Sequence, residues 1–162
     1  TFVGQNYGAQ KYDRIKDGVR MGVILSILIH IPLSAIEIFG GKRIASLMVT
    51  DPSVLELCRQ YLLIVGIFVF FLGFLMVFRN CIQGMGNTWI PMLSGGLEVI
   101  SRLIFGYWLG RHSFMGIAAA EASAWISVSI MLGSSFFILF RKVLRTQTPE
   151  NATDTENIGR VS

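Results

Sequence analysis

The stretch IPMLSGGLEVISRLIFGYWL, from Ile90 to Leu109, is long enough to cross a lipid bilayer but carries two charged residues, Glu98 and Arg102. A charge at the centre of a spanning helix costs roughly 2.5 to 3.5 kcal/mol on insertion scales, so such residues usually face a polar interior or a partner. Their spacing of four puts both on one helix face, in the acid-first order that favours an ion pair. Glu98 and Arg102 are therefore the first candidates for a substrate or ion pathway, with a structural ion pair as the alternative.

The composition indicates that the whole chain is a membrane protein. Of its 162 residues 52% are hydrophobic and 15% are charged, and its mean hydropathy is +0.59, whereas about 25% of residues are charged in ordinary soluble domains. Three further apolar runs, about 22–39, 61–78 and 115–140, approach or exceed the length of a membrane span. We therefore predict an all-α membrane protein with four transmembrane helices over residues 21–140, the third span being 90–109.

The connections predict how these helices are arranged. Short turns at 83–88 and 110–113 predict that consecutive spans are antiparallel neighbours, packed as two hairpins. In the longer 41–60 connection, Asp51-Pro52 predicts a capped helix that continues into the second span. Residues 1–20 are interpreted as the end of a preceding helix and a loop, because the chain begins at Thr1 like a fragment of a longer protein. Residues 141–162 lack the apolar content to fold and predict a disordered tail.

The distribution of Lys and Arg predicts the orientation of the chain in the membrane. One side holds the basic residues of the N-terminal stretch, the 79–89 connection and the tail: Lys11, Arg14, Lys16, Arg20, Arg79, Arg141, Lys142 and Arg145. The other side holds fewer: Lys42, Arg43, Arg59 and Arg111. The positive-inside rule then places both termini in the cytoplasm, in a multi-pass protein of the inner (plasma) membrane. This location explains the net charge of +4 without nucleic-acid binding, and it makes the lipid bilayer a partner.

Other polar residues in the spans are weaker candidates for the pathway. His30 lies near Pro32 in the first span and could relay a proton, although a hydrogen-bonded packing role is the commoner one for a lone histidine. A polar face at the cytoplasmic end of the second span is formed by Arg79, Asn80 and Gln83, with either closure of a gate or contact with lipid phosphates as their role. Glu37 and Glu121 lie nearer the outer ends of their helices, where they can reach the interface.

Aromatic and small residues recur at helical spacing in the second span. Phe71 and Phe74 could share a face with Phe78 and line a drug path, with core or lipid packing as the alternative. Gly66 and Gly73 allow helix backbones to approach closely, as in ordinary bundle packing.

The sequence contains none of the motifs of an enzyme. There is no Ser-His-Asp set, metal-ligand cluster, phosphate-binding loop or dinucleotide fingerprint. We therefore expect no catalytic residues, no metal and no cofactor.

Three motifs carry a resemblance to a known family. They are FVGQNYGA at 2–9 followed by KYDRI, then RNCIQGMGNTWIP at 79–91, and then the small-residue stretch from MGIA at 115–118 to Ala124-Trp125. In these motifs and in their order, the chain resembles the C-terminal lobe of the multidrug and toxic compound extrusion (MATE) family. The matches reach from the N-terminus to about Phe140 and resemble helices nine to twelve of a twelve-helix transporter.

This resemblance implies a secondary active antiporter that exports small cationic amphipathic drugs in exchange for protons or sodium. It implies rocking of two lobes around a central cavity, so the missing N-terminal lobe of the same protein would be a partner. By the same resemblance, the matching motif residues are fold and turn elements rather than ligands: Gln5, Gly8, Ala9, Gln83 and Gly84. The family's acid on its tenth helix has no counterpart in residues 61–78, which contain no carboxylate. The alternatives are a lipid-linked saccharide flippase of the same superfamily and a non-transporting truncated membrane protein.

Overall fold

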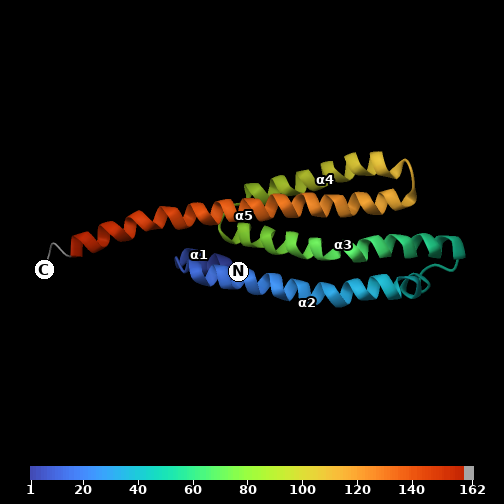
Figure 1. Cartoon of the computed structure of the whole chain (residues 1–162), viewed down its shortest axis with the longest axis horizontal. Helices are drawn as coiled ribbons and strands as arrows, with labels where there is room; N and C mark the ends of the chain where they lie inside the picture. Colours follow the sequence, from blue (N-terminus) through green and yellow to red (C-terminus); the bar gives the residue numbers. More distant parts are fainter. Residues whose placement is uncertain (159–162) are drawn as a thin grey trace.

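The computed structural model describes the backbone of residues 1–158 and the side chains of residues 1–145. Throughout this part the chain is helical, without strands, and Figure 1 shows the order of its helices. They are α1 (Phe2–Gly8), α2 (Tyr12–Ala45), α3 (Pro52–Gly84), α4 (Trp89–Gly110) and α5 (Phe114–Ile158). The all-α prediction is confirmed.

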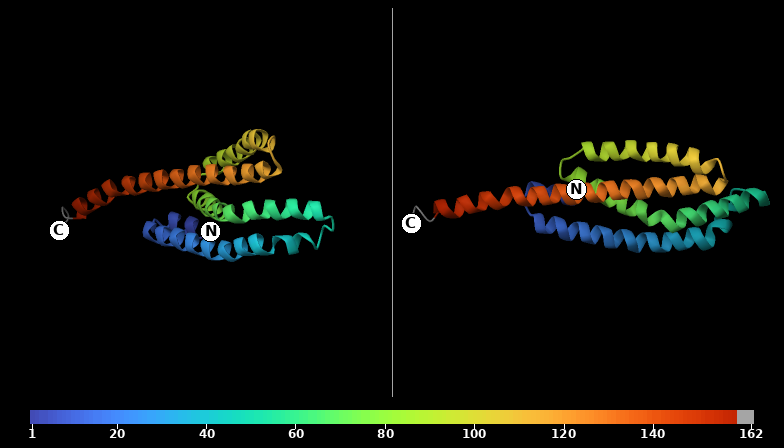
Figure 2. Two further views of the ribbon diagram at one scale, coloured as in Figure 1. Left: turned by 45° about the vertical axis from the view of Figure 1, so that its right-hand side comes forward. Right: turned by 45° about the horizontal axis from the view of Figure 1, so that its top comes forward.

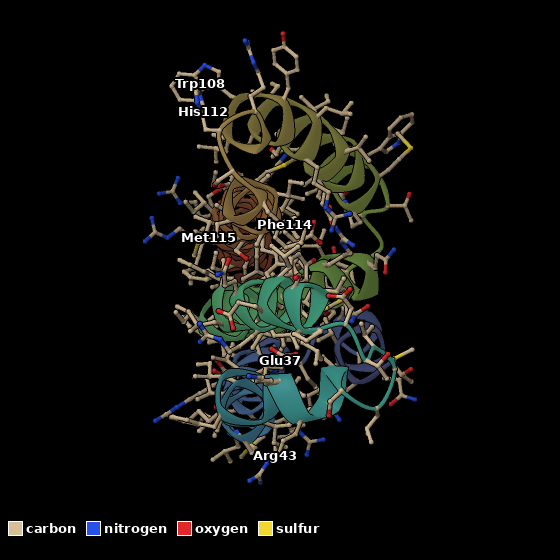
Figure 3. All side chains as sticks on the ribbon, turned by 90° about the vertical axis from the view of Figure 1, so that its right-hand side faces the viewer. Glu37, Arg43, Trp108, His112, Phe114 and Met115 are labelled. Carbon is tan, nitrogen blue, oxygen red and sulfur yellow. The ribbon has the colours of Figure 1, made fainter. Side chains whose placement is uncertain are left out.

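The four long helices lie side by side in a row, in the order α2, α3, α5, α4. Figure 1 shows this row from its flat side and Figure 3 shows it end-on. Helix α2 packs along α3, α3 along α5, and α5 along α4, whereas α3 and α4 barely touch. The prediction that consecutive spans are neighbours is therefore wrong for α3 and α4, because α5 lies between them. The short turn after Gly84 connects the ends of α3 and α4 without bringing the two helices into contact along their length.

Local chemistry explains where α3 begins and ends. Oδ1 of Asp51 accepts hydrogen bonds from the backbone N–H groups of Ser53 and Val54, at 2.8 and 3.3 Å, and Pro52 occupies the first helical position. The predicted capped helix and its continuation into the second span are confirmed. After α3 the chain turns at Gly86, whose φ of +83° is a conformation that glycine adopts without strain.

Three helical segments of the described part are long and apolar enough to cross a membrane: α2, α3 and residues 114–145 of α5. With 22 residues, α4 extends about 33 Å at 1.5 Å per residue, which is sufficient in length. It is not among the three because Glu98, Arg102 and several glycine and serine residues lower its hydropathy. The fourth span stays a prediction.

Helix α5 continues past the apolar run that predicts it. Its backbone is helical through Ile158, where the sequence predicts a disordered tail from residue 141. At the start of this extension Leu144 is still half-buried against the core, so an apolar contact supports the helix beyond Phe140. Residues 159–162 of the predicted tail lie outside the described part.

The core lies toward the end of the bundle where α1 joins α2, α3 and α5. Its fully buried side chains include Ile15, Leu75, Ile82, Val128 and Leu132. Large apolar side chains are instead exposed along α2 and α4, the two outer helices of the row, which Figure 2 shows from two further directions. Helices with a partner on one side only leave apolar faces that suit lipid or additional helices.

Candidate functional site: an ionic network across three helices

Glu98 is the centre of a network of ion pairs. Its Oε1 accepts a hydrogen bond from a terminal guanidinium nitrogen of Arg102 at 2.9 Å, one helical turn further along α4. Its Oε2 accepts one from Arg79 of α3 at 3.0 Å. The ion pair expected from the i, i+4 spacing is present, and the same carboxylate also binds a second helix.

The network extends to a third helix through Glu121. The guanidinium of Arg102 donates to Oε1 of Glu121, on α5, at 2.7 Å. We call Arg79, Glu98, Arg102 and Glu121 the ionic network. It has two cations and two carboxylates, so its charges balance, and it joins α3, α4 and α5.

Because these ion pairs are partly buried, the loss of one partner costs more free energy than it would in a surface ion pair. The side chains of Glu98, Arg79 and Glu121 are 17%, 22% and 26% exposed, and that of Arg102 is 41% exposed. Removing one partner of a buried pair leaves the other charge uncompensated, which typically costs several kcal/mol. The Nε atoms of both arginines are also buried without a hydrogen-bond partner in the described part of the chain, so the network holds unused donors.

The network also links two helices that otherwise have few contacts. Because α3 and α4 barely touch, the Arg79–Glu98 pair is a direct polar connection between them. Removing the charge of Glu98 by mutation would weaken this connection and the pair with Arg102 together. The contact between α3 and α4 therefore depends on the charge of a single carboxylate, that of Glu98.

The sequence identified only part of this network. Arg79 is predicted as a gate or lipid-contacting residue and Glu121 as an interface residue, yet both point toward α4. Each lies 19 positions from its partner in the sequence, and no periodicity connects residues on different helices at that separation. Asn80 does not join them: its side chain is exposed and makes no hydrogen bond to another described residue.

His30 lies in a separate place, between α2 and α3. Its Nδ1 is 2.7 Å from the backbone carbonyl oxygen of Ser26, and because a carbonyl only accepts, Nδ1 donates. His30 lines a cavity of about 380 Å³ together with Ser34, Phe70 and Phe74. Within residues 1–145 no hydrogen bond or ion pair joins this cavity to the ionic network, so His30 and Glu98 do not form one site there.

Glu37 faces α3. Figure 3 shows Glu37 between α2 and α3, whereas Arg43, also on α2, lies on the side of this helix that faces away from α3. Its Cβ lies beside Gly66, and its Oε2 is buried without a hydrogen-bond partner among the described residues.

The predicted aromatic face divides into two parts. Phe71 stacks on Phe70 with ring centroids 4.8 Å apart, and its backbone carbonyl accepts a hydrogen bond from the Ser129 hydroxyl of α5 at 2.9 Å. Phe74 and Phe78 instead line a groove between α2, α3 and α5. Phe71 therefore contributes to helix packing and does not line that groove.

The motif residues at the N-terminus and after α3 shape turns. The Gln5 carbonyl accepts a hydrogen bond from the Ala9 N–H at 3.1 Å, and Gly8 ends α1. The Gln83 carbonyl accepts one from the Gly86 N–H at 2.9 Å, while the Gln5 and Gln83 side chains are exposed. Gly84 packs directly against α1. Within the described part of the chain, no group of three or more His, Cys, Asp or Glu side chains could hold a metal ion.

Comparisons with known proteins agree with the motifs. The family model MatE matches residues 1–108. A probable multidrug resistance protein NorM of Thermotoga maritima is 25% identical over 143 residues, covering 86% of this chain and 30% of its own length. A probable multidrug resistance protein NorM of Aromatoleum aromaticum is 25% identical over 157 residues, covering 91% of this chain and 34% of its own length. The chain thus spans about a third of the length of these curated relatives.

Proposed function

This chain belongs to the MatE family, and from that premise we propose that it is part of a secondary active multidrug efflux antiporter of the inner membrane. The transporter would export small cationic amphipathic compounds in exchange for protons or sodium. Two relatives named as probable multidrug resistance proteins support a role in drug efflux. The apolar helices support membrane insertion.

The topology we propose has four spans, with α4 as the third and both termini in the cytoplasm. The ion pairs of Glu98 and Arg102 support the insertion of α4, because paired charges are less costly in a membrane than isolated ones. A second lobe, from the part of the transporter that this chain does not span, would form the other wall of the substrate path.

The observation that carries a mechanism is the ionic network. Transport by alternating access requires helices that move relative to one another around a central site. The Arg79–Glu98 ion pair holds α4 against α3, and the Arg102–Glu121 ion pair holds α4 against α5. The charge of Glu98 would therefore bias the position of α4 between these two neighbours. In this proposal Glu98 is the charge-sensitive connection of the pathway, and loss of its charge weakens the contact with Arg79.

The flippase alternative has less support. A lipid-linked pyrophosphate would need unpaired cations along its path, whereas both arginines of the network are bound to carboxylates. The network therefore offers no free cation to a pyrophosphate group.

The test replaces Glu98 in the longer transporter that contains this chain. Glu98→Gln keeps the size of the side chain but removes its charge, and Glu56→Gln is the matched control because Glu56 pairs with Arg59 at 2.6 Å on an exposed surface. We expect dye efflux from cells to fall by about tenfold or more for Glu98→Gln, equivalent to about 1.4 kcal/mol, with membrane abundance unchanged. The control should stay near wild type in both measurements.

Two other outcomes would count against this role. If efflux and membrane abundance fall together, the network is structural. Wild-type efflux by Glu98→Gln would remove Glu98 from the mechanism.

A further inference from the structure

A groove of about 810 Å³ runs between α2, α3 and α5 on the surface of the bundle. Its walls are aromatic: Phe74 and Phe78 of α3 face Phe136, Phe137 and Phe140 of α5. The rings form a continuous wall, since Phe78 and Phe136 have centroids 5.6 Å apart, as do Phe136 and Phe140. We call this feature the aromatic groove.

One end of the aromatic groove is basic. Lys16 and Arg20, one turn apart on α2, and Arg141 on α5 belong to its lining, which contains no carboxylate. All three side chains are exposed. Lys16 has a solvent-exposed ion pair with Asp13 at 3.2 Å, whereas Arg20 and Arg141 form no ion pair with a described residue.

The aromatic wall and the basic end of the groove together suit a ligand that has both an apolar chain and an anionic group. The phenylalanine rings favour a hydrocarbon chain through close packing rather than through transfer from water, because lipid tails already surround a membrane-spanning bundle. The three cations favour an anion and repel the cationic compounds proposed as transport substrates. Basic pockets between membrane helices at the cytoplasmic face suit anionic lipid headgroups, and the Lys and Arg distribution assigns this end of the bundle to the cytoplasm.

We propose that the aromatic groove binds an anionic phospholipid of the cytoplasmic leaflet. Its phosphate contacts Arg20, Arg141 and Lys16, and one acyl chain lies along the phenylalanine wall. The lipid holds α2 and α5 together across α3 at the end where the core lies. This site is separate from the ionic network and does not depend on transport.

Native mass spectrometry of the purified chain in mild detergent tests the proposal. The probes are phosphatidylglycerol, phosphatidylcholine and inorganic phosphate. We expect phosphatidylglycerol to be retained in preference to phosphatidylcholine, and phosphate alone to be lost. Arg20→Gln combined with Arg141→Gln should weaken phosphatidylglycerol binding by roughly thirtyfold.

A matched control removes the same charge at the opposite end of the bundle. Arg43 and Arg111 are exposed there, so Arg43→Gln combined with Arg111→Gln should leave binding unchanged. Phe137→Ala tests the acyl contact independently, because this side chain is 59% exposed and its loss should weaken lipid binding without unfolding the chain. Circular dichroism checks the fold of every variant.

Four results would overturn the proposal. Equal retention of phosphatidylcholine would show that the basic end does not select the headgroup. Stable binding of phosphate alone, with Phe137→Ala unaffected, would show an anion site without a lipid. Equal losses in the groove and control variants would assign the binding to net charge, and absence of binding in the longer transporter would show that another part of that protein covers the groove.

Discussion

At the scale of single residues, close contacts with glycine decide how α1 is held. A Cβ built on Gly84 would lie 3.0 Å from Cβ of Val3 and 3.2 Å from the backbone nitrogen of Gly4, and one on Gly4 would lie 3.2 Å from the carbonyl oxygen of Gly84. These distances are shorter than ordinary van der Waals contact. The end of α3 therefore touches α1 through two glycines, where backbone atoms limit any adjustment.

Gly84→Ala should destabilise the chain. The added methyl group would force α1 away from α3, and overpacking of this kind typically costs about 1 to 3 kcal/mol. The measurement is the free energy of unfolding in mixed detergent micelles, followed by circular dichroism. The control is Gly96→Ala on α4, where no atom lies within 4 Å of the new methyl group; it should be neutral or stabilise the helix by up to about 1 kcal/mol. Equal effects of the two changes would contradict the contact.

The ionic network shows what could be predicted at this scale. The Glu98–Arg102 pair could be predicted because both residues lie on one helix face, and local spacing determines such contacts. The pairs of Arg79 with Glu98 and of Arg102 with Glu121 could not, because they depend on how α4 lies relative to α3 and α5. The role of these residues in transport stays a prediction.

At the scale of helices, two glycines allow α2 to pack closely on α3. A Cβ on Gly66 would lie 2.9 Å from Cγ1 of Ile38, and one on Gly73 would lie 2.8 Å from Nδ1 of His30 and also clash with Oγ of Ser26. The hydroxyl of Ser34 donates to the Gly66 carbonyl at 2.5 Å. The small residues at helical spacing therefore lie at a close helix interface.

Gly73→Ala should separate α2 from α3 and disturb the hydrogen bond of His30. We expect the free energy of unfolding to fall by about 1 to 3 kcal/mol, measured by the same micelle titration. Gly22→Ala is the control on the same interface, since its methyl group would meet only Cγ1 of Val77 at an ordinary 3.5 Å. If both variants unfold like the wild type, the glycines are not required for close packing.

Helix boundaries were predictable where capping or turn chemistry is local. Asp51-Pro52 predicts the start of α3 because the cap involves only the next three residues. The end of α5 could not be predicted in this way, because its last turns run through polar sequence without a local cap or turn signal. The neighbour of α4 was also not predictable, since a short turn limits the distance between helix ends but does not exclude a third helix between them.

At the scale of the whole molecule, a single row of helices cannot surround a substrate path. The row has α2 and α4 at its edges, each with an exposed apolar face. In the proposed transporter, further helices cover part of these faces and complete the cavity.

We therefore expect this chain alone to export nothing. Cells that express the 162-residue chain should accumulate a cationic dye like cells without it, while cells with the longer transporter should extrude it. Dye fluorescence at matched membrane abundance is the measurement. Drug resistance conferred by the chain alone, for example as a homodimer, would show that one copy can replace the second lobe.

The position of α5 between α3 and α4 has a consequence for biosynthesis. During translation α4 leaves the ribosome before α5, the helix that it packs along in the finished bundle. Until α5 follows, Glu98 can pair with Arg79 and Arg102, but Arg102 lacks its second carboxylate, Glu121. In the proposed four-span topology, α4 would therefore complete its insertion together with α5, and a chain that ends in the loop at 111–113 would lack the surface that α4 packs along.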